Sequence, residues 1–251
     1  MSTTRHVPSA GGTRVGRVLP EGAPLRRFLA NEVIFLDGDA VDALLEVAQG
    51  VVRLCKLLAD GRRAVLGFRY PGELLETGWA RRHGTTAEAV TAVVLRTSRR
   101  PWADDTVAGA PELHRRLSAL LWAELDAAQA NLLLLGRMTA TERVAHFLLG
   151  LARRARADEP VDLPMSRLDI ADHLGLTVET VSRIISRLRR QGLIALQGTS
   201  RIRLLRPATL RALAGSDEHA WNGDDATALP GRPIPACMPA HGHRQPAAMA
   251  A

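Results

Sequence analysis

Four polar side chains recur at helical spacing in the C-terminal half of the chain. Glu179, Ser182, Arg183 and Ser186 lie three or four residues apart, so a helix would present them on one face. Short polar side chains near the start of such a helix can reach base edges in the major groove of DNA. Arginines farther along the helix can contact phosphates. This face therefore predicts nucleic-acid binding.

Positive charge is concentrated around this face. The stretch from Glu179 to Arg211 holds eight arginines and one acid, a net charge of +7, which equals the net charge of the whole chain of 251 residues. A localised basic patch is typical of a nucleic-acid surface, although an arginine face that is only solvated remains the alternative on charge alone. The residues expected to contact the DNA backbone are Thr177, Ser186, Arg187, Arg189, Arg190, Arg201 and Arg203.

The elements that would position these residues form a helix-turn-helix pattern over residues 167–186. Ser166 can cap the first helix, and Asp169 can complete a capping box three residues later. Gly175 stands at the turn, where a positive φ costs glycine least. Thr177 can cap the second helix. A second set of residues in that helix repeats at core-facing spacing: Val181, Ile184, Ile185 and Leu188.

A two-stranded wing is expected after the second helix. The β-prone runs 193–196 and 201–204 flank the turn residues 197–200, which is a hairpin signal. The arginines of the second run would then lie along the DNA backbone. Capping, wing and charge together favour a winged helix-turn-helix that binds DNA. A three-helix bundle with a merely structural turn is the alternative.

The N-terminal half has a different pattern. Short β-prone runs broken by turn signals are typical of a small barrel or sandwich, and Asp60-Gly61 predicts a tight hairpin turn. The predicted strand runs are 33–36, 45–47, 51–57, 64–68 and 89–95.

A long helix is predicted from about residue 112 to residue 136, because apolar residues there step by four and three. This stripe favours dimerisation, and packing against its own domain is the alternative. The stripe consists of Leu121, Leu125, Ala128, Leu132 and Leu135. A second helix is expected from near Thr141 to Arg156.

Composition excludes several protein classes. No stretch approaches the roughly 18 apolar residues of a membrane span, and residues 1–12 lack the apolar region of a secretory signal, so a cytoplasmic protein is expected. Cys55 and Cys237 are too few for a disulfide scaffold or a four-thiolate cluster. No nucleophile elbow, P-loop, zinc-ligand spacing or dinucleotide fingerprint is present, so an enzyme is not expected.

The order of these elements resembles the Crp/Fnr superfamily of bacterial transcription regulators, over about residues 28–214. Segments 34–74 and 134–149 and the helix-turn-helix carry the resemblance. Val178 to Arg183 is similar to the Fnr/FixK type; the cyclic-AMP receptor type usually has arginine in place of Val178 and glycine in place of Ser182.

The resemblance implies an α+β fold and a division of the chain. The expected parts are a jelly-roll β-barrel like a cyclic-nucleotide-binding domain (25–110), a dimerisation helix (111–136) and a winged helix-turn-helix (137–214). Composition separately predicts a loose N-terminus (1–24), which contains scattered glycines and prolines, and a disordered tail (215–251), which is rich in proline and glycine and poor in large apolar residues.

The resemblance also implies that Glu179, Ser182 and Arg183 read a TTGAT half-site. Arginine suits guanine, glutamate can accept from cytosine, and serine can bond either neighbour, so the chemistry agrees. A homodimer would bind a TTGAT-N4-ATCAA-like inverted repeat and work with RNA polymerase.

The barrel poses the question of an effector. A cyclic-nucleotide site needs an arginine before a Ser/Thr-Ala pair, and the matching segment 84–88 has glycine or threonine there, although Arg81 and Arg82 lie just upstream.

An oxygen-sensing cluster is excluded because no cysteine precedes Cys55. His83 is a possible haem ligand but is expected to be a solvated loop histidine. Cys55 is expected to be a small core residue, with a redox-active thiol as the alternative.

The remaining hypothesis is a FixK-like regulator, whose barrel keeps its shape and binds no cofactor or metal. The resemblance implies activation of microaerobic respiration or nitrogen-fixation genes. A ligand-gated regulator, whose barrel binds a cyclic nucleotide, haem or another effector, is the alternative. In the tail, Cys237, His241 and His243 are interpreted as incidental rather than as a metal site.

Overall fold

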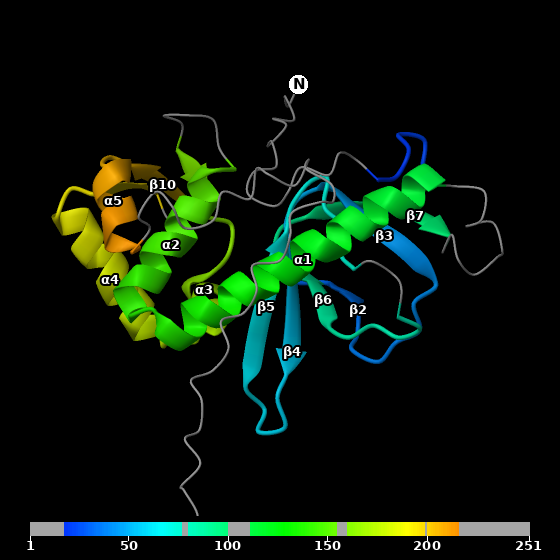
Figure 1. Cartoon of the computed structure of the whole chain (residues 1–251), viewed down its shortest axis with the longest axis horizontal. Coiled ribbons are helices and arrows are strands. Elements are labelled where there is room, and N and C mark those ends of the chain that lie inside the picture. The colour runs from blue at the N-terminus through cyan, green and yellow to red at the C-terminus, as the bar shows by residue number, and fades with distance from the viewer. Residues whose placement is uncertain (1–17, 77–79, 100–110, 155–159, 199, 216–251) are drawn as a thin grey trace, which may run out of the picture.

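The computed structural model describes residues 18–76, 80–99, 111–154, 160–198 and 200–215. A β-sandwich domain and a smaller helical domain lie on either side of the view, and helix α1 runs in front of the sandwich towards the helical domain (Figure 1). The elements are β1 (Leu25–Phe28), β2 (Val33–Phe35), β3 (Ala43–Gln49), β4 (Val52–Leu57), β5 (Arg63–Arg69), β6 (Thr86–Ala89), β7 (Val93–Arg99), α1 (Pro111–Arg137), α2 (Ala140–Ala152), β8 (Val161–Asp162), α3 (Arg167–Leu174), α4 (Val178–Arg190), β9 (Ile194–Gln197), β10 (Arg201–Leu204) and α5 (Pro207–Leu213).

The N-terminal strands form two antiparallel sheets, as the turn-rich pattern predicts. One sheet has the order β1-β7-β3 and the other the order β2-β6-β4-β5. Apolar side chains of both sheets, such as Phe28, Val47, Val52 and Leu95, share one buried cluster. Alternate residues along each strand enter this core, which is why short β-prone runs form the sandwich.

The predicted run 89–95 is wrong as a single strand. Residues up to Ala89 belong to β6 in one sheet, and residues from Val93 belong to β7 in the other. The chain changes sheets between them, beside Gly50, whose φ is +86°. A Cβ atom at Gly50 would lie 2.3 Å from the carbonyl oxygen of Ala92, so only glycine allows this close approach.

Residues 18–24, within the segment expected to be loose, contact the sandwich. The amides of Val18 and Leu19 each donate to Oε2 of the buried Glu46 at 2.8 Å. Arg96 Nη1 donates to the other oxygen of Glu46 at 3.1 Å. Val18 and Leu19 pack with Leu117 of α1, so this segment joins the long helix to the sandwich.

The helical domain contains α2 to α5 and a small sheet of order β8-β10-β9. Helix α2 begins after a capping box formed by Thr139 and Glu142 and ends at Ala152, earlier than the predicted Arg156. Strand β8 adds a third strand to the predicted wing. Among the described residues, no helix is long and apolar enough to cross a membrane.

Candidate nucleic-acid interface

The turn between α3 and α4 is built from the local signals in the sequence. Ser166 Oγ accepts from the Asp169 amide at 3.1 Å, and Asp169 Oδ2 accepts from the Ser166 amide at 3.0 Å. Gly175 ends α3 in the left-handed region, at φ 62° and ψ 41°. Thr177 Oγ1 then accepts from the Thr180 amide at 3.2 Å and starts α4. These bonds satisfy amides that a helix end leaves free, so they fix where α4 begins.

Helix α4 has one buried face and one exposed face, as its spacing predicts. Val181, Ile184, Ile185 and Leu188 are all buried. Glu179, Arg183, Arg187, Arg189 and Arg190 are exposed, and Ser182 and Ser186 are half-buried. The helix therefore presents a polar, mainly cationic face to solvent.

The polar face of α4 borders an open hollow of about 520 Å³. The residues that line this hollow are Thr180, Ser182, Arg183, Ile184, Ser186, Arg187 and Arg190. The structure thus brings together two of the three predicted base-contacting residues, Ser182 and Arg183. Glu179 lies on the same helix, one turn before Arg183, and is not among the lining residues.

Two of the predicted backbone-contacting arginines have partners within the protein. Arg187 Nη2 donates to Thr141 Oγ1 at the start of α2. Arg201 Nε donates to Asp162 Oδ1 at 2.8 Å, from β10 to the neighbouring strand β8. Both members of this second pair are half exposed, so the pair adds little stability and serves to orient the guanidinium. Arg203 is exposed two residues farther along β10.

The stripe on α1 is exposed to solvent. Leu121, Leu125, Leu132 and Leu135 are 40 to 72% exposed, and Ala128 is exposed as well. Leu117 and Leu134 of the same helix are buried, so α1 packs on the rest of the chain through a different face. The alternative that the stripe packs within its own domain does not hold for the described residues. Exposed apolar stripes of this kind mark interaction surfaces.

Comparisons with known proteins agree on both halves of the chain. The cyclic nucleotide-binding domain family matches residues 25–101, and the Crp-like helix-turn-helix domain family matches residues 142–213. The nitrogen fixation regulation protein FixK of Bradyrhizobium diazoefficiens is 43% identical over 194 residues, which cover 75% of this chain and 81% of that protein. The chain belongs to the Crp/Fnr family of transcriptional regulators.

Two further Crp/Fnr relatives support this assignment. The transcriptional activatory protein AadR of Rhodopseudomonas palustris is 38% identical, with 76% of this chain and 81% of that protein covered. The solved structure of FixK2 from Bradyrhizobium japonicum is similar with a TM-score of 0.73 and 37% identity, and the match covers 78% of this chain and 98% of that one. These relatives are transcriptional regulators of the Crp/Fnr family, not enzymes.

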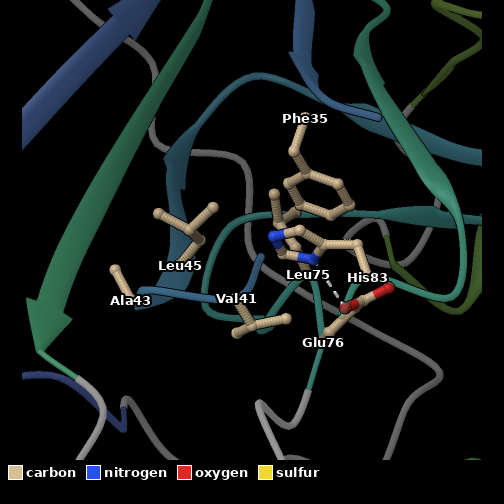
Figure 2. Close-up of a pocket in the computed structure, with 7 residues that line it drawn as sticks. All are labelled: Phe35, Val41, Ala43, Leu45, Leu75, Glu76 and His83. Carbon is tan, nitrogen blue, oxygen red and sulfur yellow. Dashed lines mark hydrogen bonds and ion pairs between the residues drawn. The ribbon is translucent and has the colours of Figure 1, made fainter. Parts of the chain in front are cut away.

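A small hollow in the sandwich is lined by residues of β2 and β3 and of neighbouring segments. Here the rings of Phe35 and His83 stack, with centroids 3.6 Å apart, and fill this space (Figure 2). His83 Nδ1 lies 2.8 Å from Glu76 Oε2, and Thr85 Oγ1 donates to Glu76 Oε1 at 3.0 Å. The remaining hollow, which Leu75 also lines, has no room for a water molecule. As the described residues line it, this hollow is too small for a cyclic nucleotide, and the Glu76 carboxylate would repel a phosphate group there.

The prediction that His83 is a solvated loop histidine is wrong. Its side chain is only 6% exposed, because the Phe35 ring covers one face and Glu76 satisfies a ring nitrogen.

The prediction that Cys55 is a core residue is confirmed. The thiol is buried, donates to the Thr86 carbonyl at 3.6 Å, and has a pKa raised to about 11 by burial beside Glu88.

A metal site is not apparent in the described part of the chain. The described residues contain no group of three or more His, Cys, Asp or Glu side chains placed to hold an ion. Cys237, His241 and His243 lie outside the described residues.

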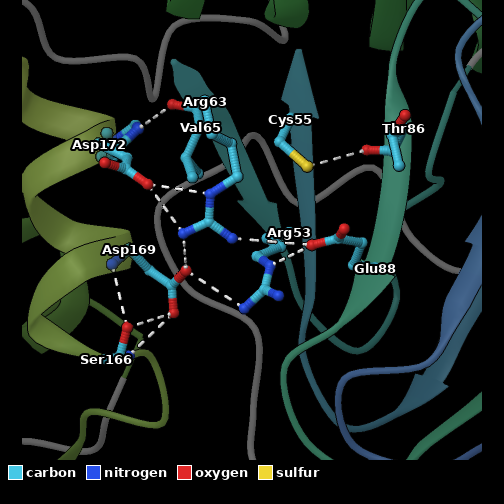
Figure 3. A network of polar contacts seen from close by, with 10 residues as sticks. Arg53, Cys55, Arg63, Val65, Thr86, Glu88, Ser166, Asp169 and Asp172 are labelled. Carbon is cyan, nitrogen blue, oxygen red and sulfur yellow. Dashed lines mark hydrogen bonds and ion pairs between the residues drawn. The ribbon is translucent and has the colours of Figure 1, made fainter. Parts of the chain in front are cut away.

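Sequence reasoning missed one set of polar residues. Arg53 and Arg63 of the sandwich contact Asp169 and Asp172 of α3 (Figure 3). The sequence places Asp169 in the capping box of the first helix and assigns no role to Asp172. No local pattern connects residues more than a hundred positions apart.

Proposed function

We propose that this Crp/Fnr protein binds DNA as a symmetric homodimer at an inverted repeat of the TTGAT-N4-ATCAA type and activates transcription there without a bound effector. The observation that carries the proposal is the polar face of α4, because it is exposed, cationic and held by capped helix ends. In this proposal residues 25–110 are a scaffold, 111–136 the dimerisation helix and 137–214 the DNA-binding domain.

Residue types on α4 support the base contacts. Arg183 can bond guanine O6 and N7 together, Glu179 can accept from cytosine N4, and Ser182 can bond a neighbouring base. The exposed start of a helix is the part that enters a major groove in helix-turn-helix proteins. We assign phosphate contacts to the surrounding polar residues: Thr177, Ser186, Arg187, Arg189, Arg190, Arg201 and Arg203.

The exposed stripe on α1 supports the dimer. Leucines at alternating steps of four and three form the seam along which two helices pack, and burying such side chains is favourable. Two recognition helices related by a two-fold axis would meet the two halves of an inverted repeat.

The filled sandwich interior supports function without an effector. Phe35 and His83 stack in the hollow lined by β2 and β3 and leave no room there for a ligand. Similarity to a nitrogen fixation regulation protein and to a transcriptional activatory protein supports activation of microaerobic or nitrogen-fixation genes. RNA polymerase is then the protein partner.

Fluorescence anisotropy tests the proposal directly. Purified, ligand-free protein is titrated onto a labelled TTGAT-N4-ATCAA duplex and onto a scrambled duplex at the same salt concentration, because phosphate contacts make affinity salt-dependent. Selective binding at least about a thousandfold tighter than to the scrambled duplex is expected. Weak or unselective binding that becomes tight and selective when cyclic AMP or another effector is added would instead support a ligand-gated regulator.

A further inference from the structure

The sandwich and the helical domain share one continuous core. Cys55 and Val65 on the outer face of the β4-β5 sheet belong to the same buried cluster as the apolar residues of α2, α3 and α4. The ring of Phe68 lies 5.4 Å from that of His173 and 6.3 Å from that of Phe147. His173 Nδ1 donates to the Val65 carbonyl at 3.0 Å. The helix-turn-helix is therefore packed against the sandwich.

Polar contacts surround this shared core on one side. Arg63 Nη2 lies 2.7 Å from Asp169 Oδ1 and 2.8 Å from Asp172 Oδ2. Arg53 Nη1 lies 3.2 Å from the same Asp169 oxygen, and its Nε lies 2.6 Å from Glu88 of β6 (Figure 3). We call Arg53, Arg63, Asp169 and Asp172 the clamp.

Each carboxylate oxygen of Asp169 binds a different set of donors. Its Oδ2 accepts from the amide and the hydroxyl of Ser166 and so completes the capping box at the start of α3. Its Oδ1 accepts from Arg53 and Arg63, so both carboxylate oxygens are fully used. The residue is only 2% exposed. A buried carboxylate with this many donors holds one position, because each displacement breaks several charge-assisted bonds.

Ionisation of the clamp agrees with this geometry. Burial raises the pKa of Asp169, but the hydrogen bonds from Ser166 and the charges of Arg53 and Arg63 outweigh it, so the pKa is lowered. The carboxylate is charged at neutral pH, as the two guanidinium groups require.

The position of α3 determines the position of α4. The two helices are joined by a short turn that ends at Thr177, the N-cap residue of α4, and residues of both helices lie in the shared core. The sandwich also contacts α1 through Leu117 and the ion pair between Arg69 and Glu124. The clamp thus links the recognition helix to the helix that carries the stripe, by way of the sandwich.

We propose that Arg53 and Arg63 are positioning residues that set the angle of α4 relative to α1 and so select the length of the spacer between the two half-sites. This inference rests on the proposed function. One added base pair rotates a half-site by about 34° and moves it by about 3.4 Å. The clamp and the shared core together resist this displacement of α4, and the loss of a clamp contact lowers the resistance.

The experiment compares duplexes with spacers of three, four and five base pairs between fixed TTGAT and ATCAA half-sites. Anisotropy is measured for the wild type, for Arg63→Gln and for Asp172→Asn, which removes one clamp partner and leaves the α3 cap in place. We expect the wild type to bind the preferred spacer at least about tenfold tighter than its neighbours, the loss typical of one mismatched base pair. In both variants this ratio falls to about threefold or less.

The ratio of affinities for duplexes with different spacers distinguishes a change in the position of α4 from a loss of stability. A variant that only unfolds in part lowers the active concentration equally for every duplex and leaves the ratio unchanged. Arg62→Gln is the matched control, because Arg62 lies next to Arg63 on the same hairpin and its ion pair with Asp60 is exposed. We expect it to keep the wild-type ratio.

Several outcomes would overturn the inference. Unchanged spacer ratios in both clamp variants would do so, as would an equal change in Arg62→Gln or a wild type that binds all three spacers alike. Failure of the proposed function looks different, because the wild type would then bind the TTGAT duplexes no better than the scrambled one.

Discussion

Arginines that are equivalent by composition have different surroundings in the folded chain. Arg183 is exposed beside the hollow of α4, whereas Arg187 is bound to Thr141 and Arg201 to Asp162. A guanidinium already oriented by the protein suits a fixed phosphate position, and an unconstrained one near the helix start can reach into a groove. At the residue scale, we therefore expect an arginine's position on its element to decide whether it contacts a base or a phosphate.

Replacing two arginines separately tests this distinction. Arg183→Ala should cost about 1–3 kcal/mol of binding free energy at one guanine and relax specificity at that base pair. Arg203→Ala should weaken binding to all sequences by a similar factor, because a phosphate contact carries no sequence information. Anisotropy titrations on duplexes substituted at each half-site base give both results. A uniform loss across sequences for Arg183→Ala would exclude its base-reading role.

At the scale of elements, the turn between α3 and α4 depends on Gly175. Its φ of 62° lies in the left-handed region, and a Cβ atom there would meet Arg143 Nη1 at 3.6 Å and Leu135 Cδ2 at 3.7 Å, which are ordinary contacts. Gly175→Ala should therefore lower the free energy of unfolding by about 1–2 kcal/mol through backbone strain rather than a clash.

Gly150 provides the matched comparison. It lies inside α2, and an added Cβ would meet only Arg153 Nη2 at 3.8 Å. Gly150→Ala should raise the free energy of unfolding by about 0.5–1 kcal/mol, because alanine loses less backbone entropy in a helix. Urea denaturation of both variants measures whether the free energy of unfolding falls in Gly175→Ala and rises in Gly150→Ala. A gain at Gly175 or a loss at Gly150 would contradict the backbone argument.

Local signals account for most of what the sequence predicts. The caps at Ser166 and Thr177, the turn at Gly175 and the two faces of α4 each depend on neighbours within four residues, and the structure has all of them. The α+β fold and the Crp/Fnr family were predicted as well.

Features set by contacts between distant residues were not predictable. The change of sheet between β6 and β7 depends on the approach of Gly50 to Ala92, and the burial of His83 depends on Phe35 nearly fifty residues earlier. The clamp joins strands and a helix more than a hundred positions apart. Periodicity reports which face of an element is buried but not which element covers it.

At the scale of the whole molecule, desolvation of two histidines, His146 of α2 and His173 of α3, makes stability depend on pH. Burial lowers the pKa of His173, outweighing its hydrogen bond to the Val65 carbonyl, and burial together with the charge of Arg153 lowers the pKa of His146. In the unfolded chain both histidines titrate near the ordinary value of about 6.5. The unfolded state therefore binds more protons below that pH, and the folded state loses stability as the pH falls.

We expect the free energy of unfolding to decrease between about pH 7 and pH 5.5, by at most about 1.4 kcal/mol per pH unit for each histidine. Urea denaturation at a series of pH values measures this slope. His173→Gln should lower stability at pH 7.5 and make the slope shallower, because one of the two groups no longer titrates. An unchanged slope in that variant would show that protonation of His173 is not coupled to folding.

The proposed two-fold homodimer is tested by introducing acidic residues into the leucine stripe of α1. Leu125→Glu combined with Leu132→Glu places like charges along the seam of the proposed dimer, where they would lie close to their counterparts in the second copy. Sedimentation equilibrium should then give a monomer, and binding to the full inverted repeat should weaken about a hundredfold or more, because the second half-site no longer binds within one complex. Leu57→Glu is the control, since Leu57 is 70% exposed on the β4-β5 hairpin. A dimer that persists with both α1 charges in place would mean that another surface joins the two copies, and the spacing of α4 helices would then have to be derived from that surface.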